Sequence, residues 1–218
     1  MSREDSARSA APQGVRRSVR EGASDVPPIP LDFFARPAEL VAKELLGCLI
    51  VSAIDGARCV SEIVETEAYV GPDDEASHAH RRFGITPRNQ VMYGPPGLAY
   101  IYRIYGIHFC LNAVTDGDGF PAAVLIRAAR PIDGIADMRR RRAGRSDREL
   151  LSGPGKLCQA LGIDLSLNRH SLQSPPLWME RGSAVHHSTI ATGPRIGITR
   201  SAEAPLRFWI RDNVWVSR

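Results

Sequence analysis

Residues 59–69 have the sequence Cys59-Val-Ser-Glu-Ile-Val-Glu-Thr-Glu-Ala-Tyr69, in which apolar and polar side chains interchange as they do in a β-strand. A second apolar run, 46–54, precedes it. The two runs are separated by Asp55-Gly56, a dipeptide typical of tight hairpin turns, so the pattern predicts a β-hairpin. Side chains alternate between the faces of a strand, and one face should therefore carry three polar residues. These are Glu65, Glu67 and Tyr69.

Outside this hairpin, the patterns predict more strands and a few helices. Residues 37–46 have apolar side chains at helical spacing, with Pro at the start and Gly47 after the end. Helices are also expected over 132–142 and over 147–161, the second broken by Gly153-Pro-Gly155. Strands are expected over about 98–105, 108–115, 122–129, 195–198, 206–210 and 214–216. Strand-rich runs with helices at irregular intervals indicate the α+β class.

The N-terminal 30 residues differ in composition from the rest. They mix Ser, Ala, Arg, Gly and acidic residues without apolar periodicity, and they end in Pro27-Pro-Ile-Pro30. This composition is typical of a disordered tail. The acidic residues nearly balance the arginines, so contact of the tail with DNA is the weaker interpretation. The folded body is expected to begin at Leu31.

Charge and cysteine content limit the class of protein. The 218 residues include 28 basic and 24 acidic side chains, a net charge of +4 that permits a polyanionic partner without requiring one. The 4 cysteines lack the spacing of zinc ligands, which predicts reduced, mostly buried thiols and no metal site. No apolar run reaches the roughly 18 residues of a membrane helix, and no secretory signal is evident. We therefore expect a soluble, cytoplasmic protein.

Glu67 is the first candidate for chemistry. A carboxylate fixed on a rigid strand and shielded by tyrosines can deprotonate a water as that water attacks an electrophilic carbon. The alternative is a solvated glutamate at a strand edge. A neighbouring tyrosine-rich segment could hold a planar ring, since stacking contributes about 1–3 kcal/mol per base. Its members, taken with His78, are Tyr69, Tyr100, Tyr102 and Tyr105. Tyrosines that simply pack a sheet are the competing explanation.

Four further positions allow both a functional and a structural interpretation. Tyr105 precedes Gly106 at a predicted hairpin tip, where an aromatic side chain protrudes and can wedge between base steps. Asn112 and Arg127 are polar residues within apolar strands, so each is a satisfied structural residue or a site residue. His78 follows Asp73 and Asp74, either of which could cap a short helix that carries it.

Two basic segments are weaker candidates for phosphate contacts. Gly153-Pro-Gly-Lys156 could present backbone N–H groups at a helix N-terminus, but it lacks the Walker frame, and a plain helix start is favoured. The arginine run 139–142 could line a phosphate track, although such runs are more commonly solvated helix faces.

Taken in order, the motifs resemble those of the alkyladenine DNA glycosylase (3-methyladenine DNA glycosylase) family from about Leu31 to the C-terminus. They are Glu62-Ile-Val-Glu-Thr-Glu-Ala-Tyr69, His78, Thr86-Pro-Arg-Asn89, Tyr102-Arg-Ile-Tyr-Gly106, Phe109-Cys-Leu-Asn112, Leu125-Ile-Arg127 and Ser152-Gly-Pro-Gly-Lys-Leu-Cys-Gln-Ala-Leu161. The resemblance implies one α+β glycosylase domain over 31–218, with a curved, largely antiparallel sheet core flanked by helices. It also implies binding to double-stranded DNA without a cofactor, which would associate the cytoplasmic protein with the nucleoid. A monomer is expected, because a single domain that wraps DNA needs no symmetry.

The resemblance further implies the reaction and its catalytic residues. A damaged purine is flipped out of the duplex, and its N-glycosidic bond is hydrolysed to leave an abasic site, the first step of base excision repair. The expected substrates are 3-methyladenine, 7-methylguanine, hypoxanthine and ethenoadenine. Glu67 corresponds to the family's catalytic base, and Arg127 to an arginine that holds the attacking water. Ile196 lies where the family uses a main-chain carbonyl for the same water.

The resemblance also assigns the pocket that receives the base. Tyr69, His78 and Tyr102 match the walls that sandwich the flipped base, and Asn112 matches the asparagine that disfavours the 2-amino group of guanine. Tyr105 matches the residue inserted into the vacated space in the duplex.

Two rival functions remain at the level of sequence. One is a binding module that recognises distorted DNA without chemistry, which would have no reason to keep Glu67 in a pocket. The other is a nucleoside hydrolase or other small-molecule enzyme, which needs no protruding Tyr105. The only lysines are Lys43 and Lys156, away from the Glu67 group. Because strand-nicking glycosylases use an amine to form a Schiff base, a monofunctional enzyme is expected.

Overall fold

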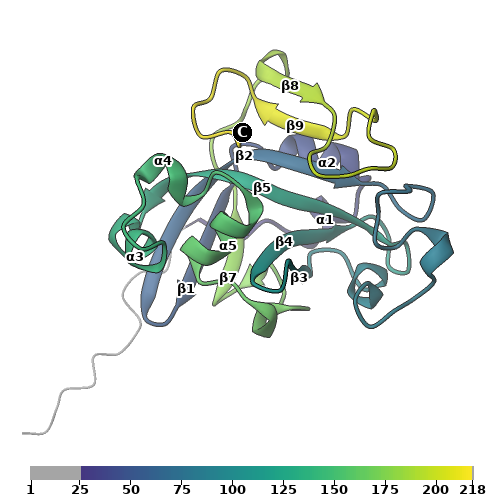
Figure 1. Cartoon of the computed structure of the whole chain (residues 1–218), viewed down its shortest axis with the longest axis horizontal. Coiled ribbons are helices and arrows are strands. Elements are labelled where there is room, and N and C mark those ends of the chain that lie inside the picture. The colour runs from purple at the N-terminus through teal and green to yellow at the C-terminus, as the bar shows by residue number, and fades with distance from the viewer. Residues whose placement is uncertain (1–25, 218) are drawn as a thin grey trace, which may run out of the picture.

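The structure is a computed structural model that describes residues 26–217 (Figure 1). Most of the predicted tail lies outside the described residues. At its described end, Ile29 is fully buried, and its N–H donates to the carbonyl of Met179 at 2.8 Å. Packing against the body therefore begins before the predicted boundary at Leu31.

Nine strands of the described chain form one curled antiparallel sheet (Figure 1). They are β1 (Leu49–Ile54), β2 (Ala57–Tyr69), β3 (Ala99–Ile104), β4 (His108–Thr115), β5 (Ala122–Asp133), β6 (Gln173–Ser174), β7 (Leu177–Glu180), β8 (Ile190–Gly193) and β9 (Arg207–Ile210). The main path runs β3-β4-β5-β2-β1-β7-β6, while β9 pairs with both β2 and β8. The predicted α+β class and its curved antiparallel sheet are confirmed.

Helices cover this sheet and close the hydrophobic core. They are α1 (Leu31–Phe34), α2 (Ala38–Glu44), α3 (Ile135–Arg141), α4 (Asp147–Leu150) and α5 (Pro154–Leu161), with single 3-10 turns at η1 (Arg81–Phe83), η2 (Gln90–Tyr93), η3 (Leu165–Leu167) and η4 (His187–Thr189). Helix α2 packs on β2, β5 and β9, and α5 packs on β4 and β5. No described helix has the length and apolar character needed to cross a membrane.

Strand β2 fixes the side chains that the hairpin pattern singled out. The Thr66 hydroxyl donates to the carbonyl of Ala42 in α2 at 2.8 Å, so this face of β2 lies under the helix. Glu65 and Glu67 point to the other face, as predicted from strand alternation, where both contact the same arginine. The segment around Glu67 pairs with β5 on one side and with β9 on the other. The Glu67 backbone is therefore held from both sides.

Several sequence predictions of secondary structure are confirmed. The hairpin turns at Asp55-Gly56, and the predicted helix 37–46 is α2. The strands expected over 98–105, 108–115, 122–129 and 206–210 are β3, β4, β5 and β9. The 4 cysteines are buried and free, as their spacing indicated.

Other predictions are wrong, and tertiary contacts explain why. Residues 195–198 are not a strand, because the Ile196 N–H bonds to the Glu67 side chain instead of a ladder partner. Residues 214–216 form a turn in which the Trp215 N–H donates to the Asn213 side chain. The helix expected from 132 begins only at Ile135, because β5 runs on to Asp133. The break expected at Gly153 within 147–161 is confirmed, since α4 and α5 are separated there.

The predicted helix around His78 is also wrong. Residues 71–80 form successive turns. Asp74 accepts bonds from the N–H groups of Val70 and Ala76, at 3.3 and 3.1 Å, and its carboxylate pairs with Arg195. These contacts hold the segment in an irregular path that positions His78.

Candidate active site

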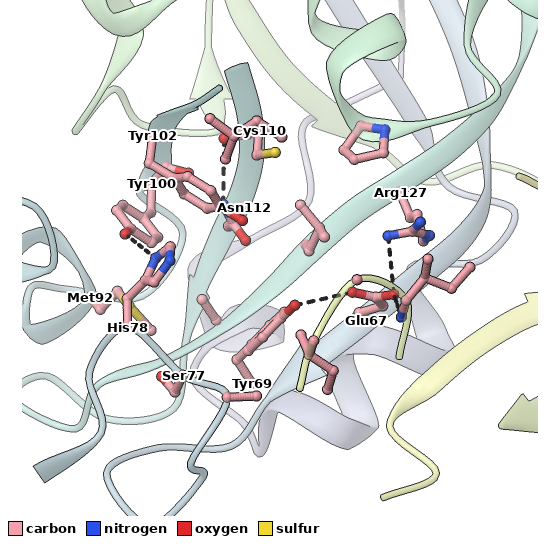
Figure 2. Close-up of a pocket in the computed structure, with 18 of the residues that line it drawn as sticks. Glu67, Tyr69, Ser77, His78, Met92, Tyr100, Tyr102, Cys110, Asn112 and Arg127 are labelled. Carbon is pink, nitrogen blue, oxygen red and sulfur yellow. Dashed lines mark hydrogen bonds and ion pairs between the residues drawn. The ribbon is translucent and has the colours of Figure 1, made fainter. Parts of the chain in front are cut away.

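A cavity of about 380 Å³ opens beside β2, between the turns at 76–78, strands β3 to β5 and the segment 196–198 (Figure 2). Its walls come from segments that are far apart in the sequence. The structure brings every predicted site residue to this cavity: Glu67, Tyr69, His78, Tyr102, Tyr105, Asn112, Arg127 and Ile196.

Glu67 is a fully buried carboxylate at the cavity surface. One oxygen, Oε1, accepts the Ile196 N–H at 2.8 Å and lies 3.2 Å from Nη1 of Arg127. The other, Oε2, accepts the Tyr69 hydroxyl at 3.1 Å. Burial raises the pKa of Glu67 above its usual value of 4.5, although Arg127 and the two hydrogen bonds oppose that shift. Glu67 is therefore a stronger base than a solvated glutamate.

Arg127 is shared between two carboxylates. Its Nε lies 3.3 Å from Glu65 and donates to the Ser217 hydroxyl at 3.1 Å, while Nη1 faces Glu67. Glu65 has further partners, Nε of Arg207 at 2.6 Å and the Ser217 N–H at 2.7 Å, and it does not line the cavity. Of the two buried acids, Glu67 alone faces the cavity.

His78 and two tyrosines form an aromatic group across the cavity from Tyr69 (Figure 2). The His78 ring meets Tyr102 edge-on, with centroids 4.6 Å apart, and Nδ1 shares a hydrogen bond of 2.8 Å with the Tyr100 hydroxyl. Burial, reinforced by the charge of Arg88, lowers the pKa of His78 to about 4. His78 is therefore neutral at physiological pH. Tyr100, which had no specific predicted role, supports this ring.

Asn112 and Tyr105 occupy the inner wall and the rim. The side-chain amide of Asn112 is buried and donates from Nδ2 to the Tyr100 carbonyl at 2.9 Å, which fixes its orientation. Tyr105 is 88% exposed at the β3-β4 tip, with φ of 49°. Gly106 follows with φ of 74°, and the Ile107 N–H closes the turn on the Ile104 carbonyl at 3.2 Å. Two successive positive φ values define a type I′ hairpin turn.

The two weaker basic candidates have structural partners. Arg139 pairs with Asp147 at 2.7 Å and Arg140 with Asp137 at 2.6 Å, while Arg141 donates to backbone carbonyls. Gly153 precedes α5 as a plain helix start, with Lys156 bonded to the Ser152 hydroxyl. The described residues contain no group of three or more His, Cys, Asp or Glu side chains able to hold a metal ion.

Sequence reasoning missed the buried network behind the cavity. Arg195 forms a bidentate ion pair with Asp74, and its guanidinium lies over the Tyr69 ring. An arginine at the start of the apolar segment Arg195-Ile-Gly-Ile198 was the available signal. That signal could not name its partner, because the two residues are 121 positions apart.

The site combines a buried carboxylate beside an arginine with aromatic walls and a projecting tyrosine at the rim. Such an arrangement can activate a water and hold a planar ring. The model of the methylpurine-DNA glycosylase (MPG) family matches residues 32–214. The chain therefore belongs to the methylpurine-DNA glycosylase family. It is a DNA repair enzyme, a hydrolase of N-glycosidic bonds that acts on damaged DNA. The predicted enzyme class and the predicted role in DNA repair are thereby confirmed.

Relatives from several organisms match over most of their length. A protein of Myxococcus xanthus, named "Putative 3-methyladenine DNA glycosylase", is 47% identical over 193 residues, which are 87% of this chain and 93% of the relative. Proteins with the same name are 47% identical in Carboxydothermus hydrogenoformans (87% of this chain, 98% of the relative) and in Methanocella arvoryzae (84% and 91%).

Proposed function

We propose that the protein removes alkylated and deaminated purines from double-stranded DNA and leaves an abasic site. The substrates would be 3-methyladenine, 7-methylguanine, hypoxanthine and ethenoadenine. The observation that supports this most directly is the Glu67 carboxylate, buried at a cavity whose other walls are aromatic. The names of the relatives support 3-methyladenine as one substrate.

In this proposal, Glu67 is the general base and Arg127 its partner. Glu67 takes a proton from a water as the water oxygen bonds to C1′ of the deoxyribose. The C1′–N bond breaks, and its electron pair leaves with the base. An N-alkylated cation departs as a neutral purine, whereas a neutral base such as hypoxanthine takes a proton from water as it departs. Arg127, 3.2 Å from Glu67, would orient the carboxylate and the water, helped by the Ile196 carbonyl. The Ile196 N–H already fixes Oε1 of Glu67, which places this backbone segment at the reacting carboxylate.

The aromatic walls would hold the flipped base. N-alkylated purines such as 7-methylguanine carry a positive charge, and a cation gains energy over an aromatic face. Tyr69 and Tyr102 offer such faces. His78 suits the same ligand because its lowered pKa keeps it uncharged, so it does not repel a cation. Flipping itself requires a few kcal/mol, least for damaged or mismatched bases, which adds selectivity before the cavity is reached.

Asn112 and Tyr105 complete the proposed recognition. The fixed amide of Asn112 lines the cavity, where it would crowd the 2-amino group that guanine has and adenine lacks. Tyr105 would enter the duplex and fill the space that the flipped base leaves. We expect the protein to act as a monomer on DNA in the cytoplasm.

Release of free base tests this function directly. Duplex oligonucleotides that contain one of the four lesions should lose the damaged base in buffer with EDTA, because neither step above requires a metal. The corresponding free nucleosides should persist, since they offer no duplex for Tyr105 to enter. Release from nucleosides at the duplex rate would instead favour a nucleoside hydrolase, and no release from any lesion would contradict the proposal.

The product should be an intact strand with an abasic site. Lys43 donates to Glu39 on α2, and Lys156 donates to Ser152 beside α5, and neither lysine lines the cavity. No lysine amine is therefore placed to form a Schiff base with C1′. Borohydride added during turnover should trap no protein-DNA adduct, and a gel of the untreated product should show full-length strand. A trapped adduct would contradict monofunctional chemistry.

The rate should fall in acid as Glu67 becomes protonated. Burial raises the pKa of Glu67, and the base acts only when ionised, so activity should be complete above this raised pKa and lost as pH falls through it. Single-turnover release of 7-methylguanine, measured from about pH 5 to pH 8, should show an acid limb centred above the usual pKa of a glutamate. A rate that stays constant until the protein unfolds would contradict this assignment.

A further inference from the structure

A buried ion pair lies behind one wall of the cavity. Arg195 and Asp74 are bidentate partners, with Nη1 to Oδ2 at 2.5 Å and Nη2 to Oδ1 at 2.8 Å. Their side chains are 0% and 2% exposed. A pair this well shielded from solvent acts on its surroundings with little screening.

The guanidinium of Arg195 is stacked on the Tyr69 ring. Its Cζ lies 4.7 Å from the ring centroid, and its Nη1 also donates to the Ala68 carbonyl at 2.9 Å. The Nε has no hydrogen-bond partner in the described part of the chain. The guanidinium is positioned by the hydrogen bonds of its two Nη atoms and by the stacked ring. Tyr69 lines the cavity and Arg195 does not. The cation therefore lies behind the wall, and a bound base would lie in front of it.

This position creates an electrostatic problem for a cationic base. A base stacked on the cavity face of Tyr69 would lie about 9 Å from the guanidinium, where two like charges in a protein interior change an equilibrium on the order of tenfold. Asp74 carries the opposite charge at hydrogen-bond distance from Arg195. Together the pair presents little net charge to the ring, and the face of Tyr69 remains attractive to a cation.

We propose that Asp74 determines the specificity of the cavity by neutralising Arg195 behind Tyr69, which allows cationic N-alkylpurines to bind as well as neutral purines. This inference rests on the proposed function, in which Tyr69 stacks on the flipped base. Arg195 gives the wall rigidity, and Asp74 removes the repulsion that the bare guanidinium would exert. Neither residue touches the base, and both act through Tyr69.

The substitution Asp74→Asn tests the effect of removing the negative charge of the Asp74 carboxylate. The amide oxygen of Asn can still accept from Arg195 or from the N–H groups of Val70 and Ala76, which now bond to the carboxylate. The double variant Asp74→Asn/Arg195→Gln removes both charges and leaves two amides that can bond to each other. Glu44→Gln is the matched control, because it removes the acid partner of Arg36 at 2.8 Å outside the cavity.

Equilibrium binding measures the effect without chemistry. The probes are two duplexes with 2′-fluoro lesion nucleotides, whose glycosidic bonds resist hydrolysis, one with cationic 7-methylguanine and one with neutral hypoxanthine. The ratio of their Kd values, cationic over neutral, should rise roughly three- to tenfold in Asp74→Asn. It should return to within about twofold of wild type in the double variant, and Glu44→Gln should not change it. A role in folding alone would weaken both complexes equally.

An unchanged ratio in Asp74→Asn, or a ratio in the double variant as high as in the single variant, would overturn the proposal. If Asp74→Asn does not fold, Arg195→Gln tests the same charge effect, and the Kd ratio should then fall instead of rise. It leaves an unpaired carboxylate, and the ratio should be at least about threefold lower than in wild type at a pH near 7. Equal ratios overturn the inference. Wild-type release of 7-methylguanine, assayed in parallel, shows whether the proposed function itself holds.

Discussion

Glu67→Gln should lower base release by at least about 100-fold while binding of lesion-containing duplex is retained. The substitution removes the only carboxylate that lines the cavity among the described residues, and an amide cannot accept the proton of the attacking water. Single-turnover release from a 7-methylguanine duplex measures the first effect. Affinity for the same duplex measures the second.

The structure indicates that glutamine fits this position. Its oxygen can accept the Ile196 N–H at the place of Oε1, and its NH₂ can donate to the Tyr69 hydroxyl at the place of Oε2. Arg127 keeps Glu65 as an ionic partner. The raised pKa of Glu67 means that its stabilising contribution is present only at low pH and is lost as pH rises through the folded-state pKa. The uncharged glutamine should therefore leave Tm at neutral pH equal or higher.

Glu62→Gln is the matched control for this experiment. Glu62 lies on the same strand, β2, but pairs with Arg130 at 2.7 Å and does not line the cavity. It should release base at the wild-type rate. Full activity in Glu67→Gln would show that another group activates the water, whereas equal losses in both variants would indicate a general defect of β2.

The part of the site that the sequence predicted depends on local patterns. Strand alternation alone places Glu65 and Glu67 on one face, because the period of a strand is fixed by backbone geometry. The Asp55-Gly56 turn likewise fixes the hairpin through the positive φ of both residues. Roles for Asn112 and Arg127 needed more than the pattern. Each was ambiguous as a polar residue in an apolar strand until the family resemblance distinguished the two interpretations.

The part that could not be predicted depends on contacts between distant segments. Arg195-Ile-Gly-Ile198 alternates like a strand, yet the fixed Arg195 side chain and the bond from Ile196 to Glu67 hold it as an irregular wall. The turns around His78 are irregular for the same reason, since Asp74 bonds across the fold instead of capping a helix. Local propensity carries no information about partners more than 100 positions away.

Tyr105→Ala should leave the fold intact and weaken lesion capture. The side chain is 88% exposed, so its removal should change stability by less than about 0.5 kcal/mol. Its backbone has a φ of 49°, a conformation that bulky residues rarely adopt. The exposed aromatic ring is not part of the hydrophobic core. If Tyr105 stacks within the duplex, its loss should remove about 1–3 kcal/mol of stabilisation from the flipped state.

The expected consequence is a fall of about 10- to 100-fold in kcat/KM for release from duplex DNA. Tyr105→Phe keeps the ring and should retain most of the wild-type value. A single-stranded oligonucleotide with the same lesion supplies the sharper comparison, because no partner strand stacks around the vacated space and the wedge has nothing to replace. Wild type and Tyr105→Ala should then act at similar rates. A loss of equal size on both substrates would place Tyr105 in the base pocket instead of the duplex, and no loss on the duplex would show that flipping does not depend on this side chain.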